Sequence, residues 1–463
     1  MRELRLYSAT SFLGHGVNVE SLRRALRLEP EAIISQGTST DPGPYFLGSG
    51  KLVMGREALK RDLSLIIKAS LDLGIPFIVS AGGAGADVHL NQVIRIIDEI
   101  SREYGVRLNL AVISGEINKE WLKAKIRGGW KATRIYPHPR LSEYLTIEDI
   151  ERSVRIVAQM GPEPIMKALD ANVHGVITGR ALDAALYVAL PLKKGYDIAL
   201  SYHLAKIMEC GGLACEPGSG TDGIFGILRH DHFEVLCLNP RRKATIRSVV
   251  AHTLYERTHP FIEEYPGGIL DLSEATYEEI DGRVIGRGAK WIPTKYTIKL
   301  EGVELIGYRA ICIAGVRDPY FIENLDYIIK SLSEEVSEHF SHLSKESFTY
   351  TIRIYGKNAI LGEAEPDPIV KSHEICLLVD VIAETQELAD SIASFISSTL
   401  SHMSYPGRKS TAGNIAYPFS PGRYISVGEV YRFNIWHKLE LEDPLEPFNI
   451  KYLEFPLSKE AGG

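Results

Sequence analysis

Residues 75–104 read IPFIVSAGGAGADVHLNQVIRIIDEISREY, and this stretch decides the fold. Its first part, 75–83, is an apolar run typical of a buried strand, and 89–104 has the spacing of an amphipathic helix. A glycine-rich turn lies between them. Glycine lets backbone N–H groups approach an anion closely, and the N-terminus of the following helix adds a favourable dipole. The stretch therefore predicts a strand–turn–helix unit with a small-molecule site at the turn.

The same alternation of apolar runs and amphipathic stretches fills the N-terminal part of the chain. It predicts α/β architecture with a mainly parallel, doubly wound sheet. Ligands of such sheets bind beyond the C-terminal ends of the strands, where the glycine-rich turns fall. A helix is predicted from a cap at Thr146 to Gln159. The other predicted elements here are strands at 4–10, 32–37, 108–116 and 173–180 and helices at 19–28 and 56–73.

The C-terminal half is predicted to be richer in strands. Short strand-like runs between 225 and 317 predict a β-rich annex. The predicted domains are an α/β domain at 1–345, with a sub-boundary near 225, and a small α+β domain of ferredoxin-like type at 346–463. The second domain rests on a β, β, α, β series at 350–356, 374–384, 386–400 and 430–441.

The composition is that of an ordinary globular protein, with 463 residues of which 45% are hydrophobic and 24% charged. A formal net charge of -7 argues against broad nucleic-acid binding, which relies on basic surfaces. No apolar run resembles a signal peptide or a membrane span, so a cytoplasmic protein without membrane contact is expected. The five cysteines are scattered and are expected to be reduced thiols. Scarce glutamine and plentiful Glu, Lys, Arg and Ile are typical of proteins from hot environments.

Neither common nucleotide-binding motif fits the glycine-rich turns. In GPYFLGSGKL, a Walker A loop would require lysine where Ser49 stands. The dinucleotide fingerprint fails because Val88 occupies the position of its last glycine. No nucleotide or nicotinamide cofactor is therefore expected, whereas a divalent metal is compatible with the residues present.

The first glycine-rich loop, GTSTDPGPYFLGSGK at 37–51, is dense in polar groups. Its hydroxyls, amides and one ammonium suit a carboxylate or phosphate, and Asp41 suits a base or a partner for a hydroxyl group. The alternative is a long surface turn in which Asp41 is only a cap. The substrate-binding candidates of this loop are Thr38, Ser39, Thr40, Tyr45, Ser49 and Lys51.

The second glycine-rich loop places Asp87 and His89 two residues apart, just after Gly83 and Gly85. A carboxylate and an imidazole at this spacing suit an oriented acid/base pair or a shared divalent metal. The alternative is that Asp87 only caps a helix and His89 lies in its first turn. We predict that the pair takes part in catalysis and that the two glycines bind substrate.

Two later segments add charged candidates. Arg180 and Asp183, three residues apart after a predicted strand, suit either a helix-surface ion pair or a carboxylate clamp whose guanidinium is held by the aspartate. Glu209 is an acid/base candidate in the loop ECGGLACEPGSGTDG. Cys210 has no basic neighbour in sequence to lower its pKa, which disfavours a nucleophile. His252 is predicted to be structural or part of the core.

Several long phrases are spread along nearly the whole chain: STDPGPYFLGSGK, SAGGAGADVHL, ALDANVHGVITGRALDAAL, ECGGLACEPGSGTDG, AHTLYE, GGILDLSEATYEEIDG, YTIKLEGVELIGYRAICIAGVRDP and TAGNIAYPFSP. These phrases resemble those of the acyclic terpene utilisation (AtuA) family, and they occur in the order the family shows. The resemblance implies a large AtuA-type N-terminal region and a ferredoxin-fold C-terminal domain. It also implies a role in the catabolism of branched acids handled as CoA thioesters, without implying a reaction.

The sequence as a whole predicts an enzyme of hydratase, dehydratase or lyase type that acts on a small carboxylic acid or its CoA thioester. Such chemistry needs an oxyanion stabiliser and a paired acid and base. Lys51 and Arg180 are expected to bind the acid. The alternative is a non-catalytic subunit that binds an acyl ligand or assembles with a partner enzyme, and a homo-oligomer is expected in either case. Proton transfer is assigned to Asp41, Asp87, His89 and Glu209.

Overall fold

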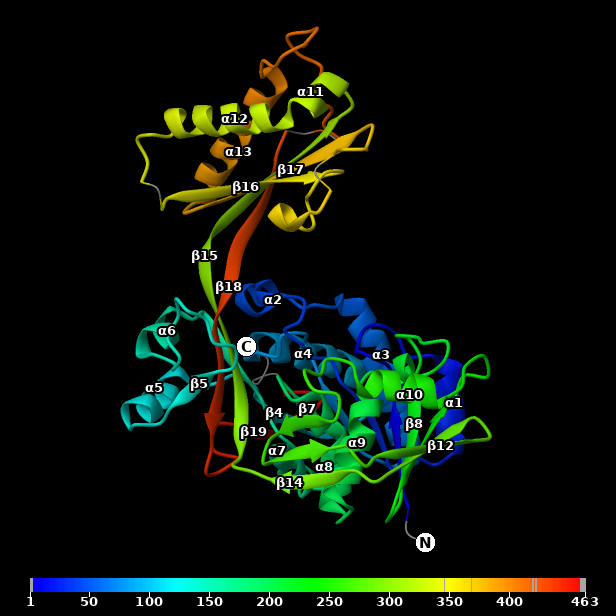
Figure 1. Ribbon diagram of the computed structural model, residues 1–463. Helices are drawn as coiled ribbons and strands as arrows, with labels where there is room; N and C mark the ends of the chain where they lie inside the picture. The colour runs from blue at the N-terminus through cyan, green and yellow to red at the C-terminus, as the bar shows by residue number, and fades with distance from the viewer. Residues whose placement is uncertain (1–2, 345, 368, 419, 421–422, 459–463) are drawn as a thin grey trace. The chain divides into compact units, whose positions relative to one another are not determined.

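The computed structural model describes residues 3–344, 346–367, 369–418, 420 and 423–458. The chain forms two compact units. The large unit comprises Met1–Glu304 and Phe433–Gly463, and the small unit comprises Leu305–Arg432. The chain passes from the large to the small unit within β15 (Thr297–Val316) and returns within β18 (Ile425–Glu440) (Figure 1). The predicted boundary at 345/346 falls inside the small unit, so it does not coincide with this division.

The core of the large unit is a ten-stranded mixed sheet in the order β12-β13-β9-β8-β1-β2-β3-β7-β4-β19. The five central strands, β1, β2, β3, β7 and β4, pair parallel with one another. The strands on either side of these five pair antiparallel with their neighbours. The α/β prediction is therefore confirmed for a mixed sheet with a parallel core. The parallel strands are β1 (Leu4–Ser8), β2 (Ala32–Ser35), β3 (Phe77–Ser80), β7 (Gly175–Thr178) and β4 (Leu108–Ile113). The antiparallel strands are β8 (Ile224–Leu228), β9 (Phe233–Cys237), β12 (Thr276–Ile280), β13 (Arg283–Arg287) and β19 (Ile450–Phe455).

Helices cover both faces of this sheet because successive side chains of each strand point to opposite sides. Ile33 and Val79 belong to a core with α1 (Val19–Arg27), α3 (Arg56–Leu73) and α4 (Asp87–Tyr104). Their neighbours Ile34 and Ile78 belong to the opposite core. That core includes α7 (Glu163–Leu169), α8 (Asp183–Lys193) and α9 (Ile198–Met208).

The large unit contains further helices and strands. Its other helices are α2 (Pro44–Ser49), α5 (Lys119–Arg127), α6 (Ile147–Arg152) and α10 (Ile246–Thr253). A three-stranded antiparallel sheet consists of β10 (Ile262–Tyr265), β11 (Gly268–Asp271) and β14 (Lys290–Pro293). Two further strands are β5 (Ala132–Arg134), which pairs with β18, and β6 (Arg155–Gln159), which pairs with β15.

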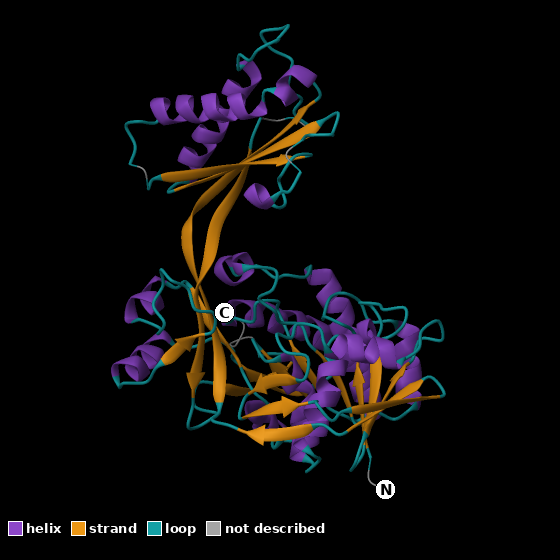
Figure 2. Cartoon of the chain, in the orientation of Figure 1, coloured by secondary structure: helices purple, strands orange, loops and turns teal. Residues whose placement is uncertain are grey.

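The small unit packs helices on one face of a sheet. β17 (Ile375–Ala383) pairs antiparallel with β15 on one side and with β16 (Phe348–Tyr355) on the other. The helices α12 (Leu325–His339) and α13 (Gln386–His402) lie along one face of these strands (Figure 2). A short helix, α11 (Pro319–Glu323), precedes them.

Two sequence predictions are wrong in the large unit. The helix predicted from Thr146 to Gln159 ends at Arg152, because the following residues pair with β15 as β6. The expectation of reduced thiols fails for Cys215 and Cys237, which form a disulfide, while Cys210 and Cys312 are free. None of the helices in the described part of the chain is long and apolar enough to cross a membrane.

The large unit buries a histidine on α9. The Nε2 atom of His203 and the hydroxyl of Tyr277 share a hydrogen bond of 2.8 Å, and the ring of Phe233 meets the imidazole edge-on at a centroid distance of 4.8 Å. Burial, with a contribution from the charge of Arg257, lowers the pKa of His203 to about 3. This side chain is therefore neutral in the folded protein at neutral and mildly acidic pH.

The neutral state of His203 predicts a pH-dependent stability. In the unfolded chain a histidine takes up a proton near pH 6.5, but in the fold the pKa is about 3. The stability present above pH 6.5 is therefore lost as the pH falls towards the folded pKa. Between about pH 7 and pH 5, the wild type should lose about 2 kcal/mol more unfolding free energy than His203→Gln. Urea unfolding at the two pH values measures this, and a constant difference between the proteins would contradict a neutral buried imidazole.

Candidate active site

Three loops meet at the C-terminal ends of β2, β3 and β7. Ser39 N donates to the carbonyl of Gly83 at 2.8 Å, and Gly83 N donates to the carbonyl of Gly37 at 3.0 Å. Arg180 N donates to the carbonyl of Gly85 at 2.9 Å. Because the C-terminal ends of parallel strands lie at one edge of a sheet, segments far apart in sequence come together here. The structure therefore joins the two glycine-rich loops to Arg180.

Gly83 and Gly85 allow these loops to touch through their backbones. Both have positive φ, +84° and +77°. A Cβ atom on Gly85 would lie 2.4 Å from the backbone nitrogen of Arg180, and one on Gly83 would lie 2.9 Å from that of Val53. The glycines that sequence reasoning assigned to substrate binding thus have a packing role in the structure.

Arg180 is buried and holds the first loop. Its Nη1 donates to the carbonyl of Thr38 at 2.9 Å, and its Nε donates to Oε2 of Glu301 at 2.8 Å. Asp183 lies farther away, at 3.8 Å from Nη1. Burial alone would raise the pKa of Glu301, but the adjacent guanidinium of Arg180 outweighs this and lowers it. The main partner of Arg180 is therefore the ionised Glu301 on β15, which sequence reasoning missed.

Oxygen atoms without hydrogen-bond partners lie in the segments that Arg180 contacts. Among the described residues, the buried atoms Oγ1 of Thr38, Oγ1 of Thr40 and Oδ1 of Asp183 have none. Asp41 is exposed, and one of its carboxylate oxygens accepts a hydrogen bond of 2.7 Å from the hydroxyl of Ser39. Burial raises the pKa of Asp183, and the charge of Asp41 adds to the rise. Unsatisfied buried polar atoms are costly, so this arrangement suits a polar ligand.

A second polar group lies where the chain leaves α9. Lys206 donates a hydrogen bond of 2.7 Å to Oε1 of Glu209, and both side chains are buried. Glu209, Cys210 and His252 each offer a donor atom, and these atoms lie within 4.8 Å of one another. Burial raises the pKa of Glu209, and the charge of Asp183 adds to that rise. Burial also raises the pKa of the Cys210 thiol, which is thus protonated at neutral pH and unsuited to be a nucleophile.

Asp87 and His89 do not meet in an acid/base pair. The Nδ1 atom of His89 accepts from the backbone N–H of Ala86 at 3.1 Å, and Nε2 donates to the carbonyl of Phe46 at 2.9 Å. Both ring nitrogens are thus occupied by backbone, and burial lowers the pKa of the imidazole. His89 ties α2 to the start of α4.

Asp87 faces a carboxylate that sequence reasoning missed. Its side chain accepts a hydrogen bond from the hydroxyl of Ser114, and its backbone N–H donates to Oε2 of Glu116 at 2.8 Å. Burial raises the pKa of Glu116, and the charge of Asp87 raises it further. The partners of Asp87 therefore lie on the segment after β4.

The remaining candidates of the first loop contact one another. The ammonium of Lys51 donates to the hydroxyl of Tyr45 at 2.8 Å. The hydroxyl of Ser49 accepts from the backbone N–H of Lys51 at 3.3 Å. Tyr45 and Ser49 lie on the short helix α2, and Lys51 follows that helix.

A cavity of about 460 Å³ adjoins the pair of Arg180 and Glu301 within the large unit. Two of its lining residues contact Oε1 of Glu301: Gln159 donates to it at 2.8 Å, and the ammonium of Lys299 lies 3.5 Å away. The cationic lining side chains are Arg134, Lys299 and Lys438, and the acidic one is Glu264. Since the positive charges outnumber the negative one, the cavity suits an anionic ligand.

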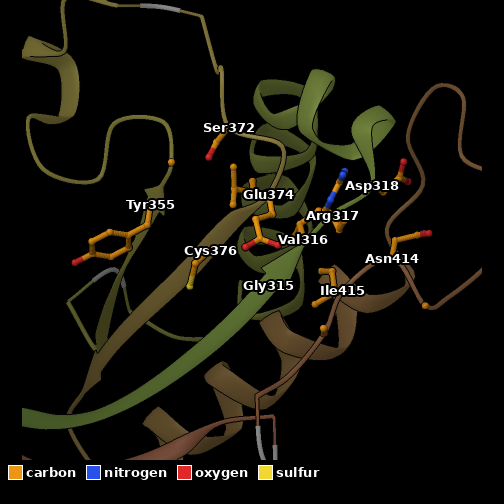
Figure 3. Close-up of a pocket in the computed structure, with 14 residues that line it drawn as sticks. Gly315, Val316, Arg317, Asp318, Tyr355, Ser372, Glu374, Cys376, Asn414 and Ile415 are labelled. Atoms are coloured by element: carbon orange, nitrogen blue, oxygen red, sulfur yellow. The ribbon is translucent and has the colours of Figure 1, made fainter.

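The small unit has a cavity of its own, of about 640 Å³ (Figure 3). Arg317, Glu374 and Asn414 are among its polar lining residues (Figure 3). None of the fourteen residues predicted from the sequence to form the site lines this cavity or the cavity of about 460 Å³. In the large unit, buried oxygen atoms without hydrogen-bond partners among the described residues lie in segments that Arg180 contacts, so we place the candidate active site there.

The comparisons with known proteins agree with one prediction. The family model described as acyclic terpene utilisation family protein AtuA matches residues 56–220. The matched segment includes Asp87, Arg180, Asp183 and Glu209. No curated protein and no solved structure matches the chain. The family resemblance inferred from the sequence is therefore confirmed over this segment.

Proposed function

We propose that this chain, whose residues 56–220 match the AtuA family model, is an enzyme that acts on a small carboxylic acid or its CoA thioester. The proposed reaction is the addition or removal of water or a related lyase step. One observation carries the proposal. Three buried oxygen atoms, on Thr38, Thr40 and Asp183, lack hydrogen-bond partners among the described residues, and they lie in segments that Arg180 contacts. Such atoms are stabilised when a polar ligand binds.

The carboxyl groups of Asp41 and Asp183 suit the proton transfers. Dehydration of a hydroxy acid requires a base that removes a proton from carbon and an acid that protonates the departing hydroxyl group. Two carboxyl groups whose environments differ can take these two roles. Asp41 is exposed and suits the base, whereas Asp183 is partly buried and its raised pKa favours the protonated acid.

The cavity beside Glu301 suits the acid group of the substrate. Lys299 keeps 29% of its side chain exposed there and lies 3.8 Å from the ring centroid of Trp436. An ammonium in this position would bind a carboxylate and stabilise negative charge that develops next to it. A volume of about 460 Å³ is in the range of small-molecule sites. The proposal therefore assigns carboxylate binding to Lys299 in place of Lys51.

We also propose that the small unit has ferredoxin-like topology. The elements β15, α12, β16, β17, α13 and β18 follow one another in the β-α-β-β-α-β order of ferredoxin-like domains. The sheet order β16-β17-β15-β18 supports the same topology. We further propose a cytoplasmic homo-oligomer with a role in the catabolism of acyl-CoA or related acids.

The first test is ligand binding to Lys299→Met. Purified protein is screened by thermal shift against organic acids and acyl-CoA thioesters, since a bound ligand raises the apparent stability. Lys299→Met should abolish the shift of a genuine ligand. Lys295→Met is the matched control, because Lys295 lies just before β15 with 78% of its side chain exposed. Equal ligand shifts for both variants would contradict the carboxylate-binding role.

Turnover of the identified ligand tests the chemistry. Asp183→Asn should lower the rate by roughly 100-fold to 10,000-fold while the ligand still binds, because general acid–base catalysis contributes that much. Mass spectrometry in heavy water follows gain or loss of water and exchange of the carbon-bound proton. Tight binding without conversion or exchange would favour the alternative, a non-catalytic subunit that binds an acyl ligand.

A further inference from the structure

We propose that Glu209, Cys210 and His252 form a binding site for one zinc ion or a similar divalent transition-metal ion. Their donor atoms, a carboxylate oxygen, a sulfur and an imidazole nitrogen, all lie within 4.8 Å of one another. Glu209 and Cys210 follow directly on α9, and His252 lies on α10, which packs against α9. Two packed helices thus bring the three groups to one point.

The burial of His252 supports the proposal independently of the distances between the three donor atoms. Only 8% of this residue is exposed, and its Nε2 atom is buried without a hydrogen-bond partner among the described residues. A buried nitrogen that lacks a partner is costly, and binding of a cation would remove that cost. A neutral imidazole nitrogen is a common ligand of metal ions in proteins.

The three donors match the preferences of zinc. Zinc in proteins is bound by thiolate sulfur, imidazole nitrogen and carboxylate oxygen at about 2.0–2.3 Å. Around a tetrahedral ion such donors lie roughly 3.5 Å apart, so the observed cluster needs to contract by about an ångström. Three protein ligands leave the fourth position for water or substrate, as in catalytic zinc sites.

Lys206 orients the carboxylate without blocking it. Its ammonium donates to Oε1 of Glu209 at 2.7 Å, and a carboxylate has a second oxygen that can bind an ion. Such a contact from outside the ligand set is typical of metal sites, because it fixes the ligand's orientation. When the ion binds, the S–H bond of Cys210 breaks, a sulfur–metal bond forms, and the proton leaves to solvent.

The proposal goes beyond the proposed function and is tested without turnover. Metal-stripped full-length protein is titrated with Zn²⁺ alone by calorimetry, and Co²⁺ replaces zinc for absorption spectroscopy. We expect one Zn²⁺ per chain and a thiolate-to-cobalt charge-transfer band. Cys210→Ser should lose the band, and Cys210→Ser and His252→Gln should each lower zinc affinity by at least roughly 100-fold, since even residues that only support a ligand cost 10–100-fold.

Cys376→Ser is the matched control, because Cys376 is also a free, half-buried cysteine and lies in the small unit. It should bind Zn²⁺ and Co²⁺ as the wild type does. The proposal is overturned if the wild type binds no Zn²⁺ or shows no thiolate–cobalt band, a result that does not depend on whether any variant folds. It is also overturned if Cys210→Ser retains the band or if Cys376→Ser loses it.

Discussion

Glu301→Gln should lower the unfolding free energy of the protein by about 3–5 kcal/mol. The side chain of Glu301 is fully buried, and that of Arg180 is 6% exposed. Removing the carboxylate leaves the guanidinium charged in the interior, because arginine keeps its proton. The hydrogen bond from Nε of Arg180, 2.8 Å long, also loses its charged acceptor. Urea unfolding monitored by circular dichroism measures the loss.

Two control variants test whether the expected loss of stability comes from an unpaired charge in the protein interior. Arg180→Met combined with Glu301→Met removes both charges, so it should recover most of the stability that Glu301→Gln loses. Glu20→Gln removes one partner of the exposed pair of Glu20 and Arg24, whose side chains are 54% and 42% exposed, and should leave the unfolding free energy almost unchanged. If Glu301→Gln lost as little unfolding free energy as Glu20→Gln, this result would contradict the burial of the pair of Arg180 and Glu301.

Gly85→Ala should cost about 3 kcal/mol or more of unfolding free energy. Its φ of +77° strains any residue with a Cβ atom, and that atom would lie 2.4 Å from the backbone nitrogen of Arg180. Backbone cannot rotate away as a flexible side chain can, so the two loops must separate. The same variant should weaken ligand binding, because the separation displaces Arg180 from Thr38.

Gly105→Ala is the matched control for this prediction. Gly105 ends α4 with a φ of +63°, and its Cβ would meet nothing within 4 Å. It therefore carries the backbone strain of a left-handed residue without the steric clash and should cost only about 1 kcal/mol. Equal losses in the two variants, measured by urea unfolding, would show that the close approach of Gly85 to Arg180 contributes nothing.

Part of the candidate site was predictable from the sequence. Glycine-rich turns after apolar runs predict loops at the C-terminal ends of parallel strands, and the structure joins Gly83, Gly85 and Arg180 there. The individual roles were not predictable. His89 looks like an acid/base group by spacing, but its two ring nitrogens are occupied by the backbone of Ala86 and Phe46, the second of which lies far away in the chain.

For some residues of the candidate site, the sequence pattern indicates a role only weakly or not at all. Lys206 is a lone cation on an apolar helix, three residues before Glu209, and this spacing does predict contact. Glu301 and Lys299 alternate with apolar residues, which is the usual pattern of a strand with one solvated face. In the fold, β15 pairs with β6, and Glu301 is buried beside Arg180.

The sequence by itself determined the elements whose causes are local. Hydrophobic periodicity and capping residues specify the strand β3, the helix α4 and the cap at Thr146, because each depends on neighbours in the chain. The tertiary structure alone decided that 155–159 form a strand, that β19 returns to the central sheet beside β4, and that Glu301 faces Arg180. These outcomes depend on contacts between residues that are far apart in sequence. Such contacts form only when the chain folds, so no local sequence pattern predicts them.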